Sequence, residues 1–223
     1  LFMFWNLWYS ESEVIVLLFL LAHTHCILTS QRPVPLSNLC GAGFRAACNL
    51  SEGKEETPHD EKKCKVLAAE IRLETLKVIH SRGFGHVGGS MDLADLMAVL
   101  YGEVMKFDPK NPRWEDRDWL VLSKGHAGPV AYATFGLMGY YPMEEAYTLN
   151  HPHTKFPSHT DRKLTPGVDL TTGSLGQGVS AAAGMALAAK YQGKDCRVYT
   201  LLGDGEIQEG QVWEAFMLAH HYK

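Results

Sequence analysis

The sequence places an aspartate, Asp204, between two glycines directly after the apolar stretch Val198–Leu202. An apolar stretch of this length that ends in a glycine turn predicts a buried strand with the aspartate at its carboxyl end. Ligands of parallel sheets bind beyond the carboxyl ends of the strands. One carboxylate, together with phosphate oxygens and water, is a common way to hold Mg²⁺. Asp204 is therefore a candidate metal ligand, whereas Glu206 and Glu209 suit the dipole of the next predicted helix without any ligand.

A second glycine-rich turn, Gly173–Gly178, opens a predicted helix that is rich in alanine. Free N–H groups and the dipole at a helix start favour an anion, and glycine lets the backbone approach a ligand closely. The alternative is that these glycines serve only the geometry of a tight turn. The small residues of the helix would allow another helix to pack close, either in the same domain or in another subunit.

Three histidines lie beside glycines or in a proline-rich loop: His86, His126 and His159. A single histidine of this kind is usually an ordinary surface or core residue. Three of them, in loops of a chain that also carries anion-binding turns, indicate a functional role. Imidazoles titrate near neutral pH and suit proton transfer.

Two stretches match dinucleotide-binding patterns. Gly83–Gly88 fits G-x-G-x-x-G but follows a predicted helix, so its context is wrong. Gly176–Ala181 fits G-x-G-x-x-A, follows the strand-like residues 168–172, and is followed by a strand that ends at Asp204. A Rossmann-type NAD-binding module therefore stays open as an alternative.

The elements that must position these turns alternate between helix and strand, which predicts an α/β layer structure. Ser90 is expected to cap the second helix, with a buried stripe running from Leu93 to Val104. Strand, helix and strand over residues 168–202 predict a parallel sheet with a right-handed crossover. The full set of expected elements is a helix over 61–81, a helix from 90 to 104, a strand over 118–123, a helix over 142–149, a long loop over 150–167, and the strand–helix–strand unit just named.

Composition restricts the class of protein. The chain has 223 residues, 46% of them apolar, and a net charge of −4, which does not favour nucleic acid binding. Five cysteines without a C-x-x-C pattern favour a reducing compartment, and we expect a cytoplasmic protein.

Residues 1–58 differ from the remainder and are predicted to be an extension and linker before a domain at 59–223. Their apolar run Val14–Ala22 is too short to span a bilayer, and the acidic residues before it do not fit a signal peptide. We expect no membrane partner. A wrong gene start or fragment, a membrane or targeting segment, and a structural arm are the three open explanations.

Five motifs fall in one order: GHVGG at 85–89, DRDWLVLSKGHA at 116–127, a histidine in a proline-rich loop, TPGVDLTTGSLGQG at 165–178, and LLGDGEIQEGQVWEA at 201–215. Together they resemble the N-terminal part of transketolase, most closely the split type whose N- and C-terminal parts are separate chains. The resemblance implies a parallel sheet with helices on both faces, the diphosphate-binding half of the thiamine diphosphate fold, incomplete at the C-terminus. It also implies thiamine diphosphate, Mg²⁺ and transfer of a two-carbon ketol unit between sugar phosphates in the pentose phosphate pathway.

The resemblance assigns roles to residues of this chain. Asp204 would bind Mg²⁺, and His86 and His159 would face the sugar substrate as catalytic groups. Glu209 and Glu214 resemble acids that meet across a dimer interface. The residues that would contact the cofactor are His126, Gly173, Ser174, Leu175 and Gly205.

The sequence departs from the family in three places. Val87 stands where the family motif GHPGG has proline, which leaves the loop at His86 with one fixed φ fewer, and Ser174 stands where the family often has proline. The chain ends at Lys223, before a further metal-binding asparagine of the family. A C-terminal part or subunit, in a homodimer or heterotetramer, is therefore expected to complete the site. A truncated fragment that only dimerises is the remaining alternative.

Overall fold

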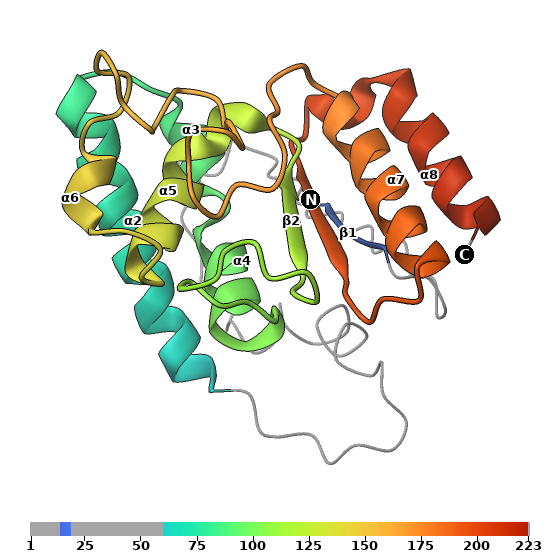
Figure 1. Cartoon of the computed structure of the whole chain (residues 1–223). Coiled ribbons are helices and arrows are strands. Elements are labelled where there is room, and N and C mark those ends of the chain that lie inside the picture. Colours follow the sequence, from blue (N-terminus) through green and yellow to red (C-terminus); the bar gives the residue numbers. More distant parts are fainter. Residues whose placement is uncertain (1–13, 19–59, 223) are drawn as a thin grey trace, which may run out of the picture.

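The computed structural model describes residues 14–18 and 60–222, and shows a three-stranded parallel sheet between two layers of helices (Figure 1). The strand order is β1 (Val14–Leu18), β3 (Val198–Leu202), β2 (Trp119–Leu122). Both neighbours of β3 run parallel to it. The α/β prediction with helices on both faces is confirmed. β1 comes from the apolar run in the N-terminal extension, and the rest of that extension lies outside the described residues.

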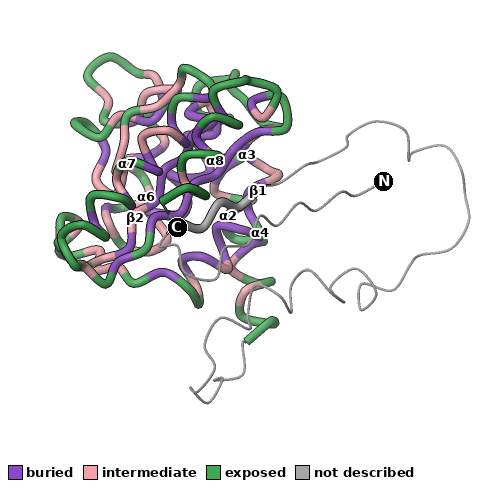
Figure 2. The backbone as a smooth tube through the Cα atoms, turned by 90° about the vertical axis from the view of Figure 1, so that its right-hand side faces the viewer, coloured by how far each residue is buried: buried purple, intermediate pink, exposed green. Residues whose placement is uncertain are grey.

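Alternating side chains of the strands serve two cores. On one face, Leu120, Leu122, Tyr199 and Leu201 join the main core with the helices α2 (Glu61–Arg82), α4 (Ala94–Val99) and α5 (Gly128–Leu137). On the other face, Val121 and Val198 pack against Ala182 and Ala186 of α7 (Gln177–Tyr191). Figure 2 shows the buried segments in the interior and the exposed backbone around them. Among the described residues, no helix is long and apolar enough to span a membrane.

Helix α2 (Glu61–Arg82) confirms the helix predicted over 61–81. Asp60 caps it by accepting a hydrogen bond from the Lys63 N–H at 3.0 Å, and Gly83 ends it in a left-handed conformation with φ 83°. Ile71 and Val78 are fully buried on the face turned to the core.

The next helical segment differs from the prediction because it begins earlier and is broken. It consists of α3 (Val87–Met91), α4 (Ala94–Val99) and a π-helix, η2 (Leu100–Val104). Ser90 lies inside α3 rather than at a cap, and its buried hydroxyl has no hydrogen-bond partner among the described residues. The predicted stripe is buried at Leu93, Leu96, Met97 and Leu100, but Val104 is 41% exposed.

The strand predicted over 168–172 is wrong. Residues 168–172 run beside the outer edge of β2, where side chains rather than backbone make the hydrogen bonds. Asp169 Oδ2 accepts from the Leu120 N–H at 2.8 Å, and Thr172 Oγ1 donates to the Leu122 carbonyl at 2.6 Å. With those positions filled, the segment forms no backbone ladder, and the parallel pair is β2 and β3.

The connection between β2 and β3 contains α5 (Gly128–Leu137), α6 (Met143–Ala146) and α7 (Gln177–Tyr191). The helix predicted over 142–149 is thus a single turn. Helix α7 covers the second face of the sheet, and α8 (Gly210–Tyr222) packs on α7 (Figure 1). The sheet therefore presents the carboxyl ends of β2 and β3 to the glycine turns.

Candidate functional site

The structure brings the three predicted histidines together from three separate segments. His86 lies between α2 and α3, His126 lies in the short 3-10 helix η3 (Gly125–Ala127) after β2, and His159 lies in the long loop. The ring centroids of His86 and His126 are 5.0 Å apart, those of His86 and His159 6.0 Å, and those of His126 and His159 6.5 Å. Imidazoles this close can act on one bound molecule.

Two glycines allow this close approach. A Cβ on Gly89 would lie 3.1 Å from His126 Cδ2, and a Cβ on Gly173 would lie 3.1 Å from His159 Cδ2. Gly173 also has φ +152°, a conformation that other residues rarely adopt. The predicted anion-binding turn is therefore in contact with the histidine cluster, and Gly173 has a packing role as well as a turn role.

The surroundings of His126 favour its neutral form. Burial lowers the pKa of His126 below its ordinary value, and the neighbouring His86, Lys124 and His159 act in the same direction, while Glu206 opposes them. Glu206 lies close in the fold because its carboxylate accepts from the hydroxyl of Ser123, three residues before His126. A neutral imidazole can both accept and donate a hydrogen bond.

Asp204 lies at the carboxyl end of β3 and is exposed. No hydrogen bond or ion pair joins its carboxylate to another described residue, so both oxygens are open to a cation. The described residues contain no group of three or more His, Cys, Asp and Glu side chains that could hold a metal ion. One free carboxylate fits Mg²⁺ provided that phosphate, water or other protein oxygens complete its ligands.

The remaining predicted cofactor residues line the same end of the sheet. Ser174, Leu175 and Gly205 are exposed, and Gly205 precedes the short 3-10 helix η4 (Glu206–Gln208). Gly176, with φ 82°, is the N-cap of α7. An exposed leucine beside this turn offers apolar contact to a ligand ring.

Glu206 was missed as a site residue, because the sequence alone assigned it to the helix dipole. It is 1% exposed and accepts hydrogen bonds from Gly176 N–H at 2.9 Å, Gly203 N–H at 3.0 Å and the Ser123 hydroxyl. The spacing of Gly203 and Glu206 is that of a capping box, in which an acid reaches back three residues to a backbone N–H. This spacing is the one sequence feature that could have identified Glu206 as an acceptor for the turn after β3.

A buried ion pair was also missed. Lys124, 2% exposed in its side chain, donates from Nζ to both carboxylate oxygens of Asp92, at 2.9 and 2.8 Å. It joins the segment after α3 to the end of β2, directly before the turn that carries His126. The pair thus fixes two histidine loops relative to each other.

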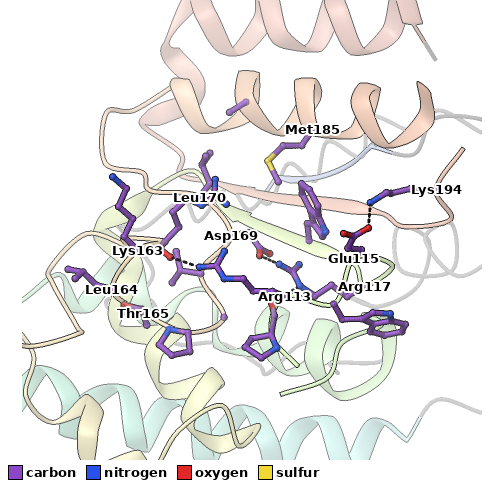
Figure 3. Close-up of a pocket in the computed structure, with 18 residues that line it drawn as sticks. Arg113, Glu115, Arg117, Lys163, Leu164, Thr165, Asp169, Leu170, Met185 and Lys194 are labelled. Carbon is purple, nitrogen blue, oxygen red and sulfur yellow. Dashed lines mark hydrogen bonds and ion pairs between the residues drawn. The ribbon is translucent and has the colours of Figure 1, made fainter. Parts of the chain in front are cut away.

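A pocket of about 610 Å³ lies elsewhere, between residues 112–119, residues 162–170 and α7 (Figure 3). None of the predicted site residues lines it. Arg117 forms an ion pair there with Asp169. Burial raises the pKa of Asp169, and the positive charge of Arg117 opposes that rise. Lys194 pairs with Glu115 at 3.4 Å across the same opening. The pocket and the histidine cluster are therefore separate features.

The dinucleotide-binding alternative loses its structural context. Gly176–Ala181 follows no strand, because residues 168–172 do not form one. The Gly176 N–H, which would face a pyrophosphate, is bonded to Glu206. The Rossmann interpretation is not favoured.

Comparison with known families agrees with this arrangement. Residues 63–223 match the family described as "Transketolase, thiamine diphosphate binding domain". The chain belongs to the transketolase family. Transketolase from Campylobacter jejuni has a similar fold, with a TM-score of 0.69 and 36% identity over 74% of this chain and 27% of that one.

Two of the relatives are transketolase subunits, as the split-type resemblance predicts. The 6-deoxy-6-sulfo-D-fructose transketolase subunit SqwG of a Clostridium species is 55% identical over 149 residues, 67% of this chain and 54% of the relative. An apulose-4-phosphate transketolase subunit from Actinobacillus succinogenes is 37% identical over 165 residues, 74% of this chain and 59% of the relative. The chain thus spans between half and three fifths of these two relatives.

Proposed function

We propose that this chain supplies the thiamine diphosphate- and Mg²⁺-binding part of a transketolase that transfers a two-carbon ketol unit between sugar phosphates. The domain proposed for this role is 59–223. The observation that carries the proposal is the meeting of three imidazoles, with centroids 5.0 to 6.5 Å apart, beside the two glycine turns. The family and the cysteine pattern support a cytoplasmic role in the pentose phosphate pathway.

Each site residue has a proposed task. Asp204 would hold Mg²⁺, which neutralises the diphosphate. Gly173, Ser174, Leu175 and Gly205 would contact the cofactor, and His126 would hydrogen-bond to it. When bound, thiamine diphosphate supplies the carbanion chemistry of the reaction.

His86 and His159 are the proposed catalytic residues. Both are exposed and face the same space as His126. A neutral imidazole at a sugar hydroxyl accepts its proton while the adjacent carbon–carbon bond breaks, and the resulting imidazolium returns a proton in the reverse sense. Two imidazoles from different loops can serve two hydroxyls of one sugar.

We also propose that a C-terminal transketolase part, carried on a separate subunit, completes the site in a homodimer or heterotetramer. The two relatives named as subunits support this division of the chain. Large apolar side chains on α8 remain exposed and suit a protein contact: Trp213, Met217, Leu218 and Tyr222. The substrates in the names of these two relatives, a sulfonated ketose and a ketose phosphate, support an anionic ketose as the donor.

Calorimetry tests the proposal. Thiamine diphosphate is titrated into the chain together with its C-terminal partner, with and without Mg²⁺. We expect binding that requires Mg²⁺, and ketol transfer only when both chains are present. Binding of NAD(H) in place of thiamine diphosphate, or no binding with the partner present, would refute the proposal.

A further inference from the structure

The Glu206 carboxylate lies where three turns of the candidate site meet. Oε1 accepts from Gly176 N–H at 2.9 Å and from the Ser123 hydroxyl, and Oε2 accepts from Gly203 N–H at 3.0 Å. Ser123 directly follows β2, Gly176 directly precedes α7 and Gly203 directly follows β3. One side chain therefore joins three segments that are far apart in the sequence.

Each of the three donors adjoins a group proposed to bind ligand. Ser123 comes shortly before His126, Gly176 directly follows Leu175, and Gly203 directly precedes Asp204. A change in the position of the carboxylate would move all three groups relative to one another. Their spacing is thus set by a single residue that does not itself face the ligand.

The chemistry of the site requires a carboxylate. The three partners are all donors, and an ionised carboxylate is an acceptor at both oxygens. A glutamine would turn an NH₂ group toward one of the backbone N–H groups, which is a donor facing a donor. An aspartate lacks the length to reach both glycines.

The charge of Glu206 is balanced by hydrogen bonds. The nearby Lys124 ammonium is engaged with Asp92, at 2.9 and 2.8 Å.

We infer that Glu206 is a positioning residue that holds the metal-binding and diphosphate-binding turns at their working separation. The inference rests on the proposed function for its ligand, but the hydrogen bonds that carry it belong to the ligand-free protein.

The test combines hydrogen exchange with calorimetry on the full chain. In Glu206→Gln, the Gly176 and Gly203 amides are expected to exchange at least tenfold faster without ligand. The Kd for thiamine diphosphate with Mg²⁺, measured with the C-terminal partner present, is expected to rise at least tenfold. Glu70→Gln, an exposed glutamate on α2, is the matched control and should change neither quantity.

Ser123→Ala keeps the carboxylate and removes one donor, so it tests the inference even if Glu206→Gln does not fold. It should weaken binding by a factor of two to five. Unchanged exchange at both glycines in Glu206→Gln, or faster exchange with an unchanged Kd, would overturn the inference. If the unsubstituted protein binds no thiamine diphosphate but the two amides still respond, the proposed function fails separately from the hydrogen-bond network.

Discussion

Gly178 of α7 packs directly on Ser123 at the end of β2: a Cβ on the glycine would lie 2.7 Å from the serine Cα. No side chain fits at that distance, so Gly178→Ala must push the start of α7 away from the sheet. We expect a loss of about 1–3 kcal/mol in the free energy of unfolding, as for other overpacked sites. Urea denaturation measures this loss.

Gly184, in the same helix, is the matched control. A Cβ there would meet no atom within 4 Å. Gly184→Ala should stabilise the protein by about 0.5–1 kcal/mol, because alanine favours the helix. Equal effects of the two substitutions would contradict the packing argument.

Asp204→Asn is expected to raise the Kd for Mg²⁺-dependent binding of thiamine diphosphate at least tenfold, because it removes the charge at the proposed metal ligand. The melting temperature should hardly change, since the carboxylate is exposed. Calorimetry with the C-terminal partner measures the Kd. Asp116→Asn, at another exposed aspartate, is the control; an unchanged Kd in Asp204→Asn would remove the metal assignment.

The lowered pKa of His126 makes stability depend on pH. Burial is the largest cause, followed by the charges of His86, Lys124 and His159, with Glu206 opposing. Around and below the ordinary pKa of 6.5 the unfolded chain binds more protons than the folded one, so the free energy of unfolding falls as the pH drops. His126→Gln should flatten that fall between about pH 7 and pH 5.

Urea denaturation at several pH values, together with an NMR titration of the His126 ring, measures both quantities. A titration midpoint of His126 above 6.5 would show that burial does not control this group.

Asp169→Ala is expected to be strongly destabilising, because it leaves the largely buried Arg117 guanidinium without its carboxylate. The Leu120 N–H also loses its acceptor. A loss of about 3–5 kcal/mol is typical when one partner of a buried pair is removed. The exposed pair of Lys194 and Glu115 gives the comparison, since Glu115→Ala should cost at most about 1 kcal/mol. Similar losses in urea denaturation would contradict the difference in burial.

Much of the fold could be predicted because local patterns and tertiary packing agree. The apolar stripe of α2, the short strands β2 and β3, and the Ala-rich α7 each carry their own signal. The three histidines could be grouped because each lies in a loop beside glycine or proline. Their actual spacing depends on side-chain packing between loops, which no local pattern describes.

The wrong strand prediction over 168–172 and the missed role of Glu206 have a common cause. Residues 168–172 have strand-like composition, but Asp169 and Thr172 bond to the edge of β2 with their side chains. A glutamate such as Glu206 is common in the first turn of a helix, but here tertiary contacts bury its carboxylate among three hydrogen-bond donors. In both places a polar side chain forms a hydrogen bond with the backbone of a distant segment. The sequence alone does not show which segment lies next to that side chain.

The side chains of Asp169 and Thr172, which lie beside β2, also affect whether another strand can pair with that edge of the sheet. A strand from another molecule adds to an edge only where a row of N–H and C=O groups is unoccupied. On the outer side of β2, the Leu120 N–H donates to Asp169 and the Leu122 carbonyl accepts from Thr172. The segment that carries these two side chains lies against this edge of β2, so a strand from another molecule would have to displace it before pairing here.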